Sequence, residues 1–136
     1  MRKIISGRRS SLSKPMKITV RTSNPGDTGN TQFQLPLNSA SPGGKAINLL
    51  VNWGDGSSNY INATNFNNTN ITKHNYASSG QYNIEIYGGI ADWKFSSMTD
   101  DDAGKLIEID QWGGFRATFS SAFEGCQSLN AIDADD

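Results

Sequence analysis

An apolar strand that runs directly into a turn bracketed by glycines is the feature that most constrains this chain. Residues 46–53 alternate between two faces, and the apolar side chains that share one face are Ile47, Leu49, Val51 and Trp53. Gly54-Asp55-Gly56 follows and supplies the positive-φ positions of a hairpin turn. Residues 59–61 then return as the partner strand. The pattern predicts a β-hairpin whose first strand, the most apolar in the chain, lies centrally in a sheet.

The same period of two recurs along most of the 136-residue sequence. It predicts further strands at residues 16–22, 32–37, 71–76, 82–87 and 106–112. Pro36 cannot donate to a strand ladder, so the strand that contains it is expected at a sheet edge. A mean hydropathy of −0.53 and many small polar residues fit long turns between strands better than helices. We therefore expect an all-β chain: one domain, or one domain plus an appendage.

The turn and two later motifs together resemble a known family. Its pattern is a W-G-D-G turn followed by H-x-Y and G-x-Y, and the matching residues here are Trp53, Gly54, Asp55, Gly56, His74, Tyr76, Gly80 and Tyr82. This resembles the polycystic-kidney-disease (PKD) family of immunoglobulin-like antiparallel β-sandwiches over about residues 45–95. The resemblance implies that these eight residues form a structural turn and its core, with His74 packed near Trp53. The chain departs from the family pattern in a long Asn-rich insert at residues 62–70, which is expected to be a loop.

A second, shorter resemblance lies near the C-terminus. Residues 119–132 resemble one unit of the BspA-like leucine-rich repeats, in which apolar residues at spacings of three precede a short strand; these are Phe123, Cys126, Leu129 and Ile132. An acidic stretch at residues 99–104 suggests a boundary before this unit. The expected organisation is an extended N-terminal arm at 1–15, a sandwich at 16–98, and a small repeat-like cap at 99–136 packed on the sandwich.

The arm at residues 1–15 is basic. Seven of the twelve basic residues in the chain precede the first acidic residue, Asp27, whereas the remainder holds five basic and thirteen acidic residues. Basic arms bind either nucleic-acid phosphates or acidic protein grooves. This arm has no aromatic residue to stack on bases but has several apolar ones, so docking to protein is favoured over nucleic acid, with a disordered tail as the plain alternative. The expected docking residues are Arg2, Lys3, Ile4, Ile5, Arg8, Arg9, Leu12 and Lys14.

Few residues suggest chemistry. Asp55 is better explained as a cap of its own turn than as a calcium ligand, because the turn lacks further spaced carboxylates. His74 is the only histidine, and no nucleophile-elbow or phosphate-loop motif accompanies it. The lone Cys126 has no partner for an intrachain disulfide. Whether the acidic stretch Asp100-Asp101-Asp102 binds a cation stays open, with a solvated loop as the default. We expect no catalytic residue, no metal and no cofactor.

The succession of the two resemblances is similar to small bacteriophage virion-associated proteins, which implies a capsid-decoration, fibre or tail-associated role. No apolar stretch follows the basic start as in a signal peptide, so assembly in the host cytoplasm and display on the virion is the expected history. The expected partners are other virion proteins, with many copies on one particle, and neither membrane nor nucleic acid. One rival is a bacterial cell-surface or adhesion module that recognises carbohydrate or protein through its loops. A second rival is an accessory domain of a secreted enzyme.

Overall fold

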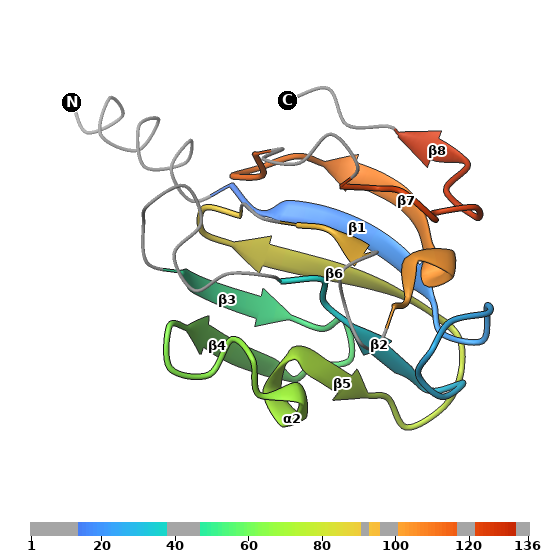
Figure 1. The fold of residues 1–136 in the computed structure, drawn as a ribbon, viewed down its shortest axis with the longest axis horizontal. Coiled ribbons are helices and arrows are strands. Elements are labelled where there is room, and N and C mark those ends of the chain that lie inside the picture. Colours follow the sequence, from blue (N-terminus) through green and yellow to red (C-terminus); the bar gives the residue numbers. More distant parts are fainter. Residues whose placement is uncertain (1–13, 38–46, 91–92, 96–100, 117–121, 133–136) are drawn as a thin grey trace.

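The computed structural model describes residues 14–37, 47–90, 93–95, 101–116 and 122–132. These residues form eight strands and almost no helix (Figure 1). In chain order the strands are β1 (Met16–Arg21), β2 (Gln32–Gln34), β3 (Asn48–Asn52), β4 (Ser58–Asn62), β5 (Lys73–Asn75), β6 (Gln81–Tyr87), β7 (Leu106–Gln111) and β8 (Ala131–Ile132). The predicted all-β class is confirmed.

Six strands make one large sheet, in the order β4-β3-β6-β1-β7-β8. All neighbours pair antiparallel except β7 and β8, which are parallel. The sheet is therefore mixed, and the expectation of purely antiparallel pairing is wrong at this edge. The predicted hairpin is present, with Leu50 opposite Tyr60. Its first strand, β3, is an interior strand next to the edge strand β4.

The remaining two strands, β2 and β5, pair with each other and lie over one face of the large sheet (Figure 1). Their pairing places Phe33 opposite His74. The strand predicted at 32–37 is shorter than expected, because β2 ends at Gln34 and Pro36, which has no N–H to donate, lies outside the ladder. In a two-stranded sheet β2 has a free edge whether or not it contains a proline.

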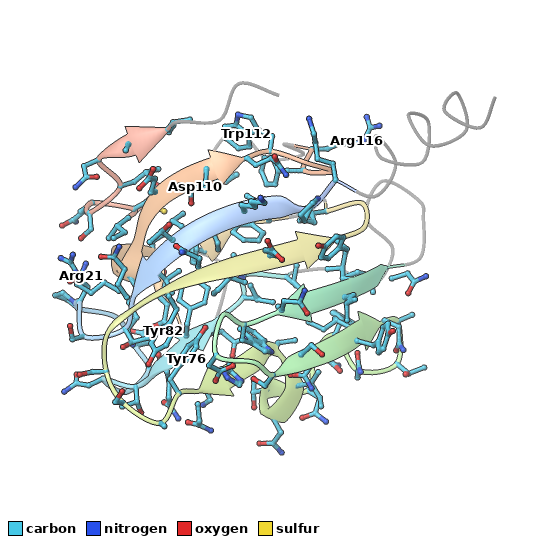
Figure 2. The ribbon with its side chains drawn as sticks, turned by 180° about the vertical axis from the view of Figure 1, so that it is seen from behind. Arg21, Tyr76, Tyr82, Asp110, Trp112 and Arg116 are labelled. Atoms are coloured by element: carbon cyan, nitrogen blue, oxygen red, sulfur yellow. The ribbon has the colours of Figure 1, made fainter. Side chains whose placement is uncertain are left out.

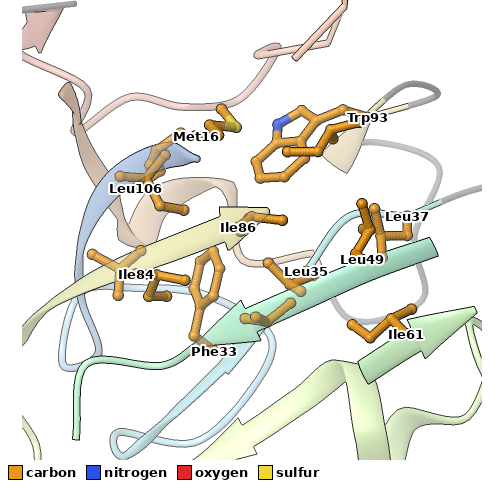
Figure 3. Packing of buried hydrophobic residues seen from close by; sticks show 14 of the residues in the cluster. Met16, Phe33, Leu35, Leu37, Leu49, Ile61, Ile84, Ile86, Trp93 and Leu106 are labelled. Atoms are coloured by element: carbon orange, nitrogen blue, oxygen red, sulfur yellow. The ribbon is translucent and has the colours of Figure 1, made fainter. Parts of the chain in front are cut away.

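The core fills the space between these two layers. Alternation puts Ile18, Ile84 and Val51 of the large sheet inward, where they join Phe33 and other fully buried side chains (Figure 3). The burial of so many aliphatic and aromatic side chains, each worth about 1.5–3 kcal/mol, is the main stabilising term.

Several local predictions need correction. The segment from Ile71 does not begin a strand: residues Thr69–Thr72 form one helical turn, α2, because the Asn68 side chain accepts the Asn70 amide and caps it. Beyond β6, Ile90 and Trp93 make isolated β-bridges, to Phe115 and Leu37 respectively. The arm residues 1–13 lie outside the described part of the chain.

The boundary expected at residues 98 and 99 does not separate two sheets. β7 pairs with β1 along most of its length, so the chain after the acidic stretch supplies two strands of the large sheet. The cap residues Phe123, Cys126 and Leu129 pack partly buried against the core, whereas Ile132 on β8 is exposed.

The acidic stretch is not a solvated loop where it is described. Asp102 is fully buried, and its carboxylate accepts hydrogen bonds from the Thr28 amide (3.1 Å), the Thr28 hydroxyl (2.6 Å) and the Gln34 amide (2.9 Å). The Lys105 ammonium, also buried, donates to the carbonyls of Thr28, Gly29 and Gln32 at 3.3, 2.6 and 2.8 Å. These two charged groups fix the loop between β1 and β2 to the start of β7.

We predict that Asp102→Ala lowers the free energy of unfolding by about 2–4 kcal/mol, because two amides and a hydroxyl lose a charged acceptor inside the protein. Urea unfolding followed by tryptophan fluorescence measures the loss. The matched control is Glu124→Ala, an exposed carboxylate that should change stability by less than about 0.5 kcal/mol. Equal stability of the two variants would contradict a structural role for Asp102.

Candidate functional site

The Trp53 turn sits where the large sheet meets the small one. The Trp53 side chain is completely buried and its indole N–H donates to Asn59 Oδ1 at 2.8 Å. The Trp53 amide donates to the Ser57 carbonyl at 3.0 Å and closes the turn. Gly54 and Gly56 both have positive φ, 91° and 93°. A Cβ on Gly54 would lie 2.4 Å from the Asn83 carbonyl oxygen, so this glycine is required both by conformation and by space.

Four rings from both layers stack in series on this turn. The His74 ring on β5 lies parallel to Trp53, with centroids 4.7 Å apart and planes 6° apart. Tyr76 meets His74 edge to face at 4.6 Å and stacks on Tyr82 of β6, with which it lies side by side in Figure 2. The Tyr76 hydroxyl donates to the Trp53 carbonyl at 2.7 Å and so ties the last two rings back to the turn. Burial, with a smaller contribution from Asp55, raises the pKa of Tyr76 and keeps it a neutral donor.

Asp55, Ser57 and His74 also come together here, which raises the question of a catalytic triad. His74 Nε2 lies 2.8 Å from Asp55 Oδ2 and 3.2 Å from the Ser57 hydroxyl, and the same hydroxyl donates to Asp55 Oδ1. In a nucleophilic relay the carboxylate binds one ring nitrogen and the nucleophile binds the other. Here a single nitrogen faces both groups, and the Ser57 proton is directed to Asp55. The arrangement is a capped turn that holds the imidazole in place.

The environment of Asp55 fits that reading. Its Oδ1 accepts from the Ser57 amide at 3.1 Å, as expected for an aspartate that caps its own turn. Partial burial raises the pKa of Asp55, but hydrogen bonds from His74 and Ser57 outweigh it and hold the pKa at about 2, below the usual 3.8. No group of three or more potential metal ligands gathers within the described ranges.

Three further features singled out in the sequence remain: Gly80, the docking residues of the arm, and Cys126. Gly80 follows the turn after β5, and its amide donates to the Thr22 hydroxyl at 2.9 Å. Of the predicted docking residues of the arm, only Lys14 belongs to the described part, where it is exposed. Burial raises the pKa of the Cys126 thiol to about 12, which makes it a poor nucleophile.

The structure adds residues that the sequence did not single out. The polar face of the large sheet, which points away from the core, carries a hollow of about 350 Å³ lined by side chains and backbone of β3, β6, β1 and β7. Its polar side chains are Lys17, Asn52, Asn83, Glu85 and Asp110. The only sequence signal for this group is alternation: each of these residues is next to an apolar residue along its strand and therefore points to the other face of the sheet.

Comparisons of the chain with protein-family models, curated proteins and solved structures gave no match in any of the three. The resemblances drawn from the motifs therefore remain hypotheses about this chain. Within the described residues, no helix has the length and apolar character required to cross a membrane.

We predict that the stability contribution of Asp55 disappears in acid. Its pKa in the folded protein, about 2, lies below the ordinary 3.8, so the contribution is complete above about pH 5 and is lost as the pH falls through 2. Because the side chain is partly exposed, we expect only about 1 kcal/mol. Chemical unfolding between pH 7 and pH 2 should show this loss in the parent chain. The Asp55→Asn variant should have a lower free energy of unfolding at pH 7, and that free energy should fall less as the pH is lowered. Parallel pH curves for both proteins would contradict the assignment.

Proposed function

We propose that this chain is a non-enzymatic structural protein of a bacteriophage virion, attached as a capsid-decoration, fibre or tail-associated component. In this proposal the described body is an immunoglobulin/PKD-like sandwich, and the basic N-terminal arm attaches it to the particle. The observation that carries the proposal is the separation of charge: residues 1–14 hold five basic and no acidic residues, whereas the acidic residues all lie from Asp27 onward.

The sandwich assignment is supported by the stacked turn. Two layers of strands enclose one core, and the motif residues Trp53, His74, Tyr76 and Tyr82 contact one another across those layers. The repeat-like cap is supported by the parallel pairing of β8 with β7 after a turn that holds Phe123, Cys126 and Leu129. A body of this kind is a rigid scaffold. In this proposal the contacts among Asp55, Ser57 and His74 stabilise the turn and do not catalyse a reaction.

The attachment point of the arm supports anchoring. Pro15 is buried where the arm enters β1, and its carbonyl accepts the Gln111 side-chain amide at 2.7 Å. Gly113 approaches so closely that a Cβ there would lie 2.3 Å from the Pro15 carbonyl carbon. The residue at which the arm enters β1 is thus held firmly to the end of β7. Charge-assisted bonds and burial of Ile4, Ile5 and Leu12 would offset the entropy cost of ordering the arm.

A bacterial cell-surface or adhesion module is the second candidate. The exposed Tyr60 on the edge strand β4 and the polar hollow on the same sheet favour it, since both are surface features that the anchoring role leaves unused.

Neutralising the arm tests the proposal. In the full chain, Arg2, Lys3, Arg8 and Arg9 are replaced by Gln, and binding to capsids and to tails purified from the encoding phage is measured by co-sedimentation. We expect binding to weaken at least tenfold, and binding of the parent chain to weaken in high salt, because the contacts are between charges. The control replaces Ser6, Ser10, Ser11 and Ser13 by Gln, which alters the same segment at constant charge and should bind normally.

A parent chain that binds neither particle fraction but binds bacterial cells would contradict the proposal and support the adhesion module. Equal binding by the neutralised arm would contradict the anchoring role of its charges.

A further inference from the structure

The polar face of the large sheet is built in rows that cross the strands. One row joins Asn52 on β3 to Glu85 on β6 and Lys17 on β1, and the next brings Asn83 opposite Thr19. Lys17 and Glu85 approach to 4.0 Å across this surface. Because strand neighbours alternate in direction, these side chains point away from the core that Ile18, Ile84 and Val51 form on the other side. The hollow described above lies over these rows.

A carboxylate at a strand irregularity lines the hollow. The register between β1 and β7 shifts between Lys17 and Ile18, and Asp110 is the extra residue of β7 at that shift, since Gln111 and Ile109 take the paired positions. Asp110 faces the polar side by ordinary alternation with Ile109, and the bulge leaves it without a partner in the ladder. Here Ile109 stays buried, while the Asp110 carboxylate reaches Thr19 on the polar face. Asp110 on β7 is labelled in Figure 2.

The polar groups of the hollow have unused hydrogen-bonding capacity. The buried Thr19 hydroxyl lies 2.9 Å from Asn83 Oδ1 and 2.8 Å from Asp110 Oδ2. Its single proton serves one of these acceptors at a time, so the other is left for an outside donor. Within the described part of the chain, the Asn52 side chain makes no hydrogen bond to protein. The hollow thus presents both donors and acceptors.

The charge and size of the hollow restrict its ligand. One ammonium against two carboxylates disfavours phosphates and other anions, and the ion pair between Lys17 and Glu85 leaves Asp110 as a single unpaired negative charge. A volume of about 350 Å³ suits a small molecule. The lining is not wholly polar, since Gly54 and Ile84 also belong to it, so a ligand with both polar and apolar surface fits better than a purely apolar one, which would leave the amides and carboxylates without hydrogen bonds.

Two tyrosines lie on the same face of the large sheet, one row beyond the hollow, and are not part of its lining. Leu50 on β3 lies opposite both Tyr60 on β4 and Tyr87 on β6, one row away from Asn52 and Glu85. Tyr60 is 69% exposed. Tyrosine rings offer an apolar face and a polar edge, which matches the C–H face and the hydroxyls of a sugar ring.

We propose that this hollow is a binding site for a small neutral saccharide, with Asn52, Asn83 and Asp110 bonding its hydroxyls. The site uses the body of the protein and is independent of the arm, so it stands or falls separately from the proposed attachment to a particle.

The test is a titration of the full chain, labelled with ¹⁵N, with glucose, galactose, mannose, N-acetylglucosamine and their β-1,4-linked disaccharides. We expect at least one saccharide to shift amide signals around the hollow with saturation in the millimolar range. Asn52→Ala should weaken that binding about tenfold, the value of one lost hydrogen bond to a polar ligand. The control is Asn48→Ala, an exposed residue of the same type on the same strand that does not line the hollow, and it should bind as the parent does.

Spermidine is titrated in parallel as a cationic probe. Absence of saturable saccharide shifts, or shifts that Asn52→Ala leaves unchanged, would overturn the proposal. Saturable, salt-sensitive binding of spermidine at Glu85 and Asp110 without saccharide binding would also overturn it, in favour of a cation site.

Discussion

The stack of Trp53, His74, Tyr76 and Tyr82 is the interaction on which the rest of this structure depends. Tyr82 lies on β6 of the large sheet and Trp53 directly follows β3, whereas His74 lies on β5 of the small sheet and Tyr76 directly follows it. The small sheet has only two strands and three residue pairs, too few to be stable alone. It persists because the ring contacts, worth about 0.5–1.5 kcal/mol each beyond their burial, and the Tyr76–Trp53 hydrogen bond hold it against the large one.

Asp55, Ser57 and His74, which resemble a catalytic group, take part in this stack and its turn. Asp55 and Ser57 hold the imidazole of His74 parallel to the Trp53 indole, and their hydrogen bonds are used up in doing so. The polar side chains on the other face of the large sheet do not hold the two sheets together. There the bulge at Asp110 and the amides of Asn52 and Asn83 leave polar groups available, and it is on that face that we place a ligand.

The main strands of the large sheet and the place of the ring stack could be predicted from the sequence. Residues 16–21, 48–52, 81–87 and 106–111 form strands close to the predicted limits, because alternation of apolar side chains is strong in each. The contact of His74 with Trp53 was implied by the resemblance of the motifs to the PKD family, and the structure contains it. The helical turn at Thr69–Thr72 was missed because its cause is a local cap by Asn68 inside a run of asparagines that carries no periodic signal.

Long-range polar contacts were beyond prediction for a different reason. Asp102 and Lys105 look like solvated charges in sequence, and only the approach of the loop after β1 turns them into buried partners of Thr28, 74 and 77 residues away in the chain. Asp110 faces away from the core because it follows the buried Ile109, but its contact with Thr19 at a register shift against β1 could not be read from the sequence.

Native-state hydrogen exchange on His74→Ala tests the central claim, that the ring stack holds the small sheet in place. The amides to follow are Leu35, which donates to the Thr72 carbonyl, and Tyr76, which donates to that of Thr31. We predict that their protection falls at least tenfold relative to the parent chain, about 1–2 kcal/mol of local stability, while amides between β1 and β6 keep theirs. Unchanged protection of Leu35 and Tyr76, or an equal loss in both sheets, would contradict the account.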